Sequence, residues 1–451
     1  MKGGGHLTQC KPRDSLPYLK QATGRGLVDL PKAKKSEPRI FVFKEKKMFK
    51  KIFVILSVLV ASIFLAACAQ KATCTDKIGC VEVKKGEPIH LAYSMVLTTA
   101  DATLGLDSRN GAEIAMADKG GKLLGHDIKW DGTDDLCSAE GGQAAGTKQA
   151  ADPTIVAIIG TSCSSALRVA MPLWSKAGFT VISASNTAVD LTTAGSENNH
   201  PGYLRTAHND KVQGAAAAKF AWEKLGVKKA ATIHDGSIYA QGLQQVFADE
   251  FKKMGGTITA QEAVDPKQTD MSGVLTSIAA GAPELIYHPI FIAAGTQIVN
   301  QARKTPGLEK VYLMGADGMF SPDVMKGAGD AIEGVFVSSP DFTQFGPDYA
   351  AKFLPEYKAK FGSAPVSIFH AHAYDAFNML YACVEKVAQG DKNGGDLSIG
   401  RQALRDCMYA TKDFKGLTGN LTCTPTGDCA DPKIAVYEYH TGQYPPTKIW
   451  P

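Results

Sequence analysis

The sequence predicts an α/β protein with two Rossmann-like lobes, each a parallel sheet flanked by helices, joined by a hinge of several strands. Short apolar runs alternate with Ala-rich helical stretches from Ile89 onward, which is typical of repeated βαβ units. About 380 residues follow Cys68, more than one hydrophobic core usually holds. Three segments could carry the chain between the lobes: Arg205–Asn209, Ser338–Phe342 and Lys412–Leu417. Three crossings would form a hinge, and a hinge places a cleft between the lobes.

The first lobe is predicted to begin at residue 89. Its apolar runs have the length of strands, and the stretches between them have the length and periodicity of helices. The predicted strands are Ile89–Val96, Asp127–Trp130, Ile155–Ile159, Thr180–Ser183 and Tyr203–Thr206. The predicted helices are Leu106–Asp118, Ala139–Ala151 and Ser164–Lys176.

The same alternation continues after residue 206 and predicts the second lobe. Its predicted helices are Lys211–Leu225, Gln241–Met254, Met271–Ala280 and Gly295–Lys304. Its predicted strands are Ala230–His234, Thr257–Gln261, Leu285–Tyr287, Val311–Met314 and Gly334–Val337.

The last third of the chain changes character, because long helices follow one another before a final strand. The predicted helices are Asp348–Phe361, Ala371–Gln389 and Ile399–Tyr409, and the strand, with an antiparallel pattern, is Lys433–Tyr439. If these helices return to the first lobe and the final strand joins the second, each lobe is built from two separate stretches of the chain. We expect lobe 1 to comprise residues 89–206 and 341–415, and lobe 2 residues 207–340 and 416–451.

The segment Met48–Cys68 has the features of an export signal. Lysines precede an apolar run that ends in Leu-Ala-Ala-Cys. This ending resembles a bacterial lipobox, which implies that Cys68 is diacylated and becomes the first residue of the exported protein. The alternative is a membrane-spanning helix, but Ile52–Cys68 has only 17 residues, at the lower edge of what crosses about 30 Å of hydrocarbon.

We therefore interpret residues 48–67 as a lipoprotein signal peptide and residues 68–88 as a polar, Lys-rich tether. The protein would be lipid-anchored to the outer face of the cytoplasmic membrane or lie in the periplasm. Residues 1–47 precede the signal and show no sustained periodicity. We interpret them as a mis-assigned N-terminal extension that would be disordered.

The charge balance argues against nucleic acid as a partner. The whole chain has a formal charge of +4, but residues 1–47 contribute +8 and the signal lysines Lys50 and Lys51 contribute +2. The part from Cys68 onward therefore carries −6. A mildly acidic surface offers no footprint for a phosphate backbone.

Eight cysteines follow Cys68, and an even number in an exported chain predicts disulfides. They are Cys74, Cys80, Cys137, Cys163, Cys383, Cys407, Cys423 and Cys429. Eight cysteines allow 105 pairings, and spacing does not choose among them; we expect sequential pairing. A zinc site is the competing interpretation, but no CxxC pair is present.

Two strand ends carry small polar residues suited to a ligand. The apolar run Ile155–Ile159 leads into Gly160–Ala166 at the start of a helix, where free N–H groups favour a carboxylate or another anion. We also expect Ser164 or Ser165 to cap this helix. The next strand ends in Ser183–Ala188, where backbone groups near Ser185 and the Thr187 hydroxyl could grip a small zwitterion.

Several motifs together resemble a known family. Gly-x-x-Cys-Ser-Ser at 160–165 is followed by Ile-Ser-Ala-Ser-Asn-Thr at 182–187, by the stretch His234–Leu243, and by Met-Gly-Ala-Asp-Gly at 314–318. This order resembles the leucine/isoleucine/valine-binding proteins, which are type I periplasmic binding proteins of ABC transporters. The resemblance covers about Ile89 to Tyr439 and is strongest before Phe345.

The resemblance implies roles for particular residues. Ser164, Ser185 and Thr187 would bind the α-carboxylate of an amino acid. Asp317 would pair with its α-ammonium group, and Tyr239 would close over it from the second lobe.

The resemblance also implies the pocket walls and one disulfide. Phe291 lies where the family tends to place an aromatic wall. Leu104 lies where those proteins often carry an aromatic residue, so the side-chain specificity departs from the family pattern. Cys137 and Cys163 lie where the family has a disulfide.

Other chemistry finds little support in the sequence. His370 and His372 form His-Ala-His, but residues i and i+2 of a helix point to different faces, which serves a shared metal badly. We expect no metal and no cofactor. An exported enzyme would need a nucleophile with a base or a pair of carboxylates, and no such constellation is found, so we expect no enzyme.

The sequence therefore predicts an extracytoplasmic solute-binding lipoprotein of an ABC importer. Its ligand would be a branched-chain or similar apolar amino acid, bound in the cleft between the lobes. Its partners would be this small molecule, the membrane permease and the membrane surface that holds the anchor, and the protein would be a monomer. The alternative is a sensor or receptor of the same fold for a small amide, urea or an aromatic acid.

Overall fold

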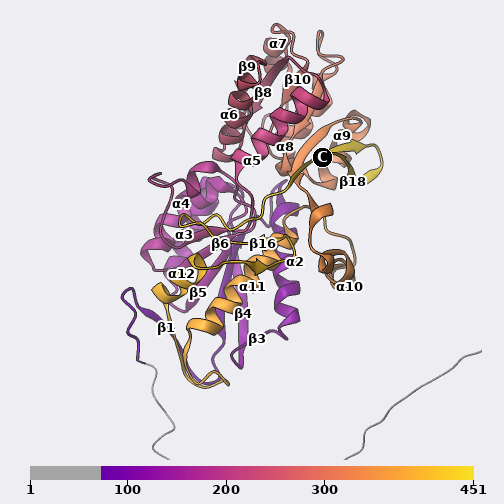
Figure 1. Cartoon of the computed structure of the whole chain (residues 1–451). Helices are drawn as coiled ribbons and strands as arrows, with labels where there is room; N and C mark the ends of the chain where they lie inside the picture. The colour runs from indigo at the N-terminus through magenta and orange to yellow at the C-terminus, as the bar shows by residue number, and fades with distance from the viewer. Residues whose placement is uncertain (1–72) are drawn as a thin grey trace, which may run out of the picture. The chain divides into compact units, whose positions relative to one another are not determined.

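The computed structural model describes residues 73–451 (Figure 1). The predicted extension 1–47, the signal peptide 48–67, the lipidated Cys68 and tether residues 68–72 lie outside the described residues, so these assignments stay predictions. Within residues 73–451, no helix is long and apolar enough to cross a membrane.

The first lobe is built on a sheet with strand order β3-β4-β2-β5-β6-β7. Its strands are β2 (Ile89–Met95), β3 (Lys122–Leu123), β4 (His126–Asp134), β5 (Ile155–Gly160), β6 (Thr180–Ser183) and β7 (Tyr203–Arg205). All neighbours from β4 to β7 are parallel, and β3 joins β4 as an antiparallel edge. The carboxyl ends of β5 and β6 therefore lie at one edge, as the sequence requires for a shared site.

Helices cover both faces of this sheet. They are α2 (Ala102–Asp118), α3 (Ala139–Ala150), α4 (Ser164–Lys176), α11 (His370–Val387) and α12 (Arg401–Tyr409), and α10 (Leu354–Phe361) packs outside them against α2. Ile159 of β5 packs in one apolar cluster with residues of α2 and α11, whereas its neighbour Ile158 packs in another with residues of α4. Figure 1 shows α11 and α12 returning to this sheet from late in the sequence.

The second lobe is built on a sheet with strand order β18-β17-β12-β11-β10-β8-β9. Its strands are β8 (Lys229–His234), β9 (Thr257–Ala263), β10 (Leu285–Tyr287), β11 (Tyr312–Gly315), β12 (Phe336–Pro340), β17 (Ile434–His440) and β18 (Gln443–Trp450). Its helices are α5 (Asp210–Lys219), α6 (Ile238–Lys253), α7 (Ser272–Ala279), α8 (Ile292–Ala302) and α9 (Pro322–Ala328). β17 pairs antiparallel with the parallel strand β12, as the pattern of the last strand predicts.

Two predicted elements need correction. The expected tether 68–88 contains the strand β1 (Cys80–Val83), which pairs antiparallel with β14 (Leu397–Gly400). Residues 397–400 form that strand, so the helix expected from Ile399 begins at Arg401. The chain also continues past β17 into a further strand, β18, that the sequence interpretation missed.

Three crossings join the two lobes. The chain leaves the first sheet after β7, returns after β12, and enters the second sheet for the last time at β17. Leu421 and Cys429 pack in the core of the first lobe, so the last crossing comes after residue 429 and not at 416 as expected.

The eight described cysteines form four disulfides between sequential partners. The pairs are Cys74–Cys80, Cys137–Cys163, Cys383–Cys407 and Cys423–Cys429. Cys383–Cys407 ties α11 to α12, and Cys137–Cys163 ties the loop after β4 to the start of α4.

Candidate ligand-binding site

Six of the seven predicted site residues line one cavity between the lobes. The lining residues are Leu104, Ser162, Cys163, Ser164, Ser185, Tyr239, Phe291, Asp317 and Phe369. The cavity volume is about 10 Å³, which is the space of about one water molecule. Leu104 of the first lobe packs into the apolar cluster of the second, so the lobes are closed on each other here. An amino acid can therefore enter only when the lobes separate.

The loop between β5 and α4 forms one end of the cavity. Ser162 donates its backbone N–H to Asp135 at 2.6 Å, and its hydroxyl accepts from Val96 N at 3.1 Å. Ser185 donates its hydroxyl to Ser162 O at 2.8 Å. These bonds, together with the Cys137–Cys163 disulfide, hold the loop rigidly at the edge of the sheet.

The expected serine cap of α4 is wrong. The residue before the helix is Cys163, and no side chain caps it. The Ser164 hydroxyl instead accepts from Ala188 N at 3.3 Å, and the Ser165 hydroxyl accepts from Ile238 N of the second lobe at 3.3 Å. Ala166 N donates to Cys163 O at 3.1 Å, but no side chain caps the first turn. The N–H groups of Ser164 and Ser165 and the positive end of the helix dipole can therefore act on an anion.

Thr187 is the predicted residue that does not line the cavity. It is fully buried, and its carbonyl accepts from Asp210 N at 3.0 Å. Its hydroxyl makes no well-formed hydrogen bond.

Asp317 lies at the opposite side of the cavity, just after β11. Its Oδ1 accepts from Gln213 Nε2 at 2.5 Å and from the Tyr239 hydroxyl at 3.2 Å. Burial raises its pKa to about 6. No lysine or arginine of the described chain forms an ion pair with it, and a buried carboxylate without a cation is costly.

The cavity wall is mostly apolar. The rings of Tyr239 and Phe291 lie 5.2 Å apart in a tilted contact. Leu104 and Phe369 complete the wall from the first lobe. The sequence does not predict Phe369, because a Phe beside the His-Ala-His motif has no local feature that marks it as a cavity residue.

Two further polar residues near Asp317 were also missed. Gln213, on α5, bonds to Asp317 and to Ser338 O at 3.0 Å. Asp210, the first residue of α5, is fully buried. In the sequence they are one polar and one acidic residue at a helix start, where a solvent-exposed position is the ordinary expectation.

The histidines of His-Ala-His serve packing. His370 lies 2.8 Å from Asp107 Oδ2 through Nδ1 and 2.8 Å from the Tyr349 hydroxyl through Nε2. His372 packs edge-on against Phe369. Both rings are buried on α11, where His372 contacts Phe369 and His370 stacks on Tyr349 and Phe353.

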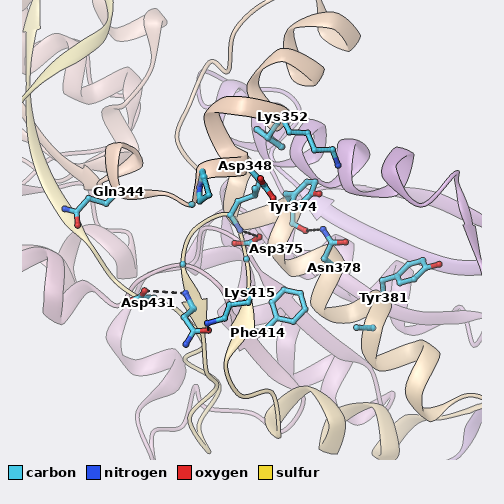
Figure 2. Close-up of a pocket in the computed structure, with 18 of the residues that line it drawn as sticks. Gln344, Asp348, Lys352, Tyr374, Asp375, Asn378, Tyr381, Phe414, Lys415 and Asp431 are labelled. Atoms are coloured by element: carbon cyan, nitrogen blue, oxygen red, sulfur yellow. Dashed lines mark hydrogen bonds between the residues drawn. The ribbon is translucent and has the colours of Figure 1, made fainter. Parts of the chain in front are cut away.

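A larger hollow lies elsewhere, between α11, the turn before α10 and the β15–β16 hairpin (Phe414–Lys415 and Asn420–Leu421), as Figure 2 shows. Its volume is about 730 Å³, and none of the predicted site residues lines it. Tyr374 on its wall donates to Asp118 at 2.7 Å, and the carboxylate of Asp375 accepts from the backbone of Leu417 and Thr418. These groups are already paired, so the smaller cavity between the lobes is the better candidate site.

Comparison with known proteins gives a family. Residues 88–443 match the periplasmic binding protein family. The chain is 26% identical over 356 residues to the leucine-, isoleucine-, valine-, threonine- and alanine-binding protein of Pseudomonas aeruginosa, covering 78% of this chain and 90% of that protein. It is 29% identical over 257 residues to the Leu/Ile/Val-binding protein of Escherichia coli, covering 56% of this chain and 68% of that protein.

Solved structures share the fold. The branched-chain amino acid transporter substrate-binding protein of Streptococcus pneumoniae, in complex with isoleucine, superimposes with a TM-score of 0.68 at 23% identity, covering 81% of this chain and 100% of that chain. A solute-binding protein of R. palustris in complex with benzoate gives a TM-score of 0.69 at 19% identity, covering 80% of this chain and 96% of that chain. At these identities the likeness establishes the type I fold alone. With the family match over residues 88–443, the chain belongs to the periplasmic binding protein family, and the resemblance to leucine/isoleucine/valine-binding proteins is confirmed.

Proposed function

We propose that this protein is the extracytoplasmic solute-binding component of an ABC importer. It binds an amino acid with an apolar side chain, branched-chain or similar, between its lobes and delivers it to the membrane permease. It works as a monomer held to the membrane by a lipid on Cys68.

The observation that carries the ligand class is the unpaired acid Asp317 across the cavity from the uncapped start of α4. A helix N-terminus attracts a carboxylate, and a buried acid calls for a cation. A zwitterion supplies both charges at once. Between them, Leu104, Phe291 and Phe369 offer an apolar surface to the ligand's side chain.

Lobe closure supplies the signal to a permease. Ligand binding favours the closed arrangement only if the ligand contacts both lobes. The cavity meets this condition, because Ser164 and Ser185 come from the first lobe and Tyr239, Phe291 and Asp317 from the second.

The second candidate ligand is an aromatic acid. The aromatic pair Tyr239–Phe291 favours it, and the related R. palustris protein is described in complex with benzoate. An aromatic acid has no cation, so it would leave Asp317 buried and unpaired. We therefore place the amino acid first.

A thermal-shift screen of the purified protein tests the proposal. The panel contains leucine, isoleucine, valine, benzoate, urea, small amides and sugars. A ligand at 100 times its Kd stabilises the native state by about 2.7 kcal/mol, which raises Tm measurably. We expect shifts with branched-chain amino acids, lost in Asp317→Asn and kept in the control Asp323→Asn, whose acid pairs with Lys326 away from the cavity. A shift with benzoate alone would replace the proposed ligand.

A further inference from the structure

One turn of α5 before Gln213, which donates to Asp317 at 2.5 Å, lies a second buried acid that the proposed binding mode does not use. Asp210 is 0% exposed, and Asp317 is 4% exposed. Neither oxygen of the Asp210 carboxyl makes a well-formed hydrogen bond, and its one polar side-chain neighbour there, the Thr187 hydroxyl, interacts with it only weakly. An acid this deeply buried with no well-formed hydrogen bond is unusual, because desolvation of an ionised carboxylate costs more than a native structure normally tolerates.

The two acids act on each other. Burial, followed by the charge of Asp317, raises the pKa of Asp210 well above its ordinary value. Two neighbouring buried carboxylates cannot both ionise unless a cation lies between them, because the like charges repel in a medium of low dielectric.

Within residues 73–451, the charged and titratable groups around the pair supply no free cation. Arg205 is the cation whose charge acts on Asp210, and its guanidinium is already bound to Asp428, to Thr192 and to the carbonyl oxygens of Asn186 and Ala188. Asp190 adds further negative charge.

The remaining titratable neighbours stay neutral. Burial keeps the pKa values of the Tyr239 and Tyr287 hydroxyls well above the ordinary range. His208, which bonds to Gln213 at 2.5 Å, is also neutral, because burial lowers its pKa to about 4.

We propose that Asp210 and Asp317 share one proton in the empty site and release it to solvent when the ligand's ammonium group enters, so that amino acid binding is coupled to proton release. The exchange conserves charge. Before binding, the pair carries one negative charge; afterwards, two carboxylates and one ammonium again sum to one negative charge. This inference rests on the proposed function, and it adds that the cation site is built from two acids and not from Asp317 alone.

The test is calorimetric titration of the wild-type protein with leucine at pH 7.0 in two buffers, phosphate and imidazole, which differ in their enthalpy of ionisation. We expect the two apparent binding enthalpies to differ by an amount equivalent to nearly one proton released per leucine. Asp210→Asn mimics the protonated acid, so its release should fall close to zero. Asp323→Asn should release as many protons as the wild type.

A second readout is the pH dependence of affinity. Release of one proton predicts that the Kd for leucine rises up to tenfold for each pH unit below the pKa of the pair, and that this slope flattens in Asp210→Asn.

The experiment distinguishes a failure of this inference from a failure of the proposed function. Equal enthalpies in both buffers, with leucine bound, would overturn the inference and leave the proposed function standing. Unchanged proton release in Asp210→Asn would also overturn it, since the proton would then come from another group. If the folded wild type bound benzoate but no amino acid, the proposed function and this inference would fail together. If Asp210→Asn does not fold, the comparison of the wild-type binding enthalpies in the two buffers still tests whether leucine binding releases a proton.

Discussion

At the scale of single residues, the Tyr239 hydroxyl joins the apolar wall of the cavity to Asp317. It donates to Asp317 at 3.2 Å and accepts from Gly318 N at 3.3 Å. Its ring contacts Phe291, so one residue contributes both apolar surface and a donor that steadies the carboxylate.

We expect Tyr239→Phe to keep the wall and lose the donor. Removing one hydrogen bond to a buried carboxylate costs about 1 to 2 kcal/mol, so the Kd for leucine should rise roughly five- to thirtyfold. Calorimetric titration measures the change. The control is Tyr312→Phe, whose side chain is 40% exposed at the far side of the second lobe. Equal affinities in the two variants would contradict the role given to the Tyr239 hydroxyl.

The sequence predicts cavity residues correctly where a recognisable motif directly follows a predicted strand. Ser164, Ser185 and Asp317 each follow a strand at the carboxyl edge of a sheet, and the structure brings all three to one cavity. Asp210 and Phe369 escape prediction because their burial depends on contacts between the lobes and the crossings, which have no local signature in the chain.

At the scale of elements, α11 is tied to the turn between β15 and β16 by one side chain. Asp375 accepts from Leu417 N at 2.7 Å, from Thr418 N at 2.9 Å and from the Thr418 hydroxyl at 2.6 Å. Its place on α11, beside the hollow of Figure 2, makes it the anchor of the segment that follows β15. The turn of the β15–β16 hairpin is thereby fixed to α11.

We expect Asp375→Asn to destabilise the protein by about 2 kcal/mol, since an amide cannot accept all three bonds and turns a donor toward a backbone N–H. Burial raises the pKa of Asp375 to about 6. The native state therefore takes up a proton below pH 6, while the unfolded chain takes it up only near pH 4, so wild type gains stability over the variant as pH falls from 7 to 5.

Urea unfolding of both proteins at several pH values measures this gap, with exposed Asp348→Asn as the control. A gap that stays constant from pH 7 to 5 would contradict the assigned titration. The other buried acids are the same in both proteins, so their contributions cancel in the difference.

Elements with a strong local pattern are predicted closely. The helix Ser164–Lys176 and the strand Thr180–Ser183 have the bounds expected from the sequence. β1 and β14 are missed because each is only four residues long and its partner lies more than three hundred residues away. Polar, Lys-rich surroundings around β1 favour a tether until that partner is known.

At the scale of the whole described chain, the closed arrangement depends on a few polar contacts around the cavity. Asp101 accepts from Ile292 N at 3.1 Å, and the Ser165 hydroxyl accepts from Ile238 N at 3.3 Å. The hydroxyls of Thr103 and Ser321 lie 3.1 Å apart. Each contact joins one lobe to the other, so each exists only while the lobes are closed, and removing one changes the closing equilibrium without touching the ligand.

We therefore expect Thr103→Val to weaken leucine binding by about two- to tenfold, which corresponds to one lost hydrogen bond of roughly 0.5 to 1.5 kcal/mol in the closed form alone. In the open form water satisfies both hydroxyls, so the association rate should change little and the dissociation rate should rise, as stopped-flow fluorescence can measure.

The matched control is Thr147→Val, an exposed threonine on α3 that bonds only to Gln143. Ser321→Ala should lower the affinity less when it is introduced into the Thr103→Val variant than when it is introduced into the wild type, because Thr103→Val has already removed the contact between the two hydroxyls. Full additivity of the two substitutions would mean that this pair does not hold the lobes together.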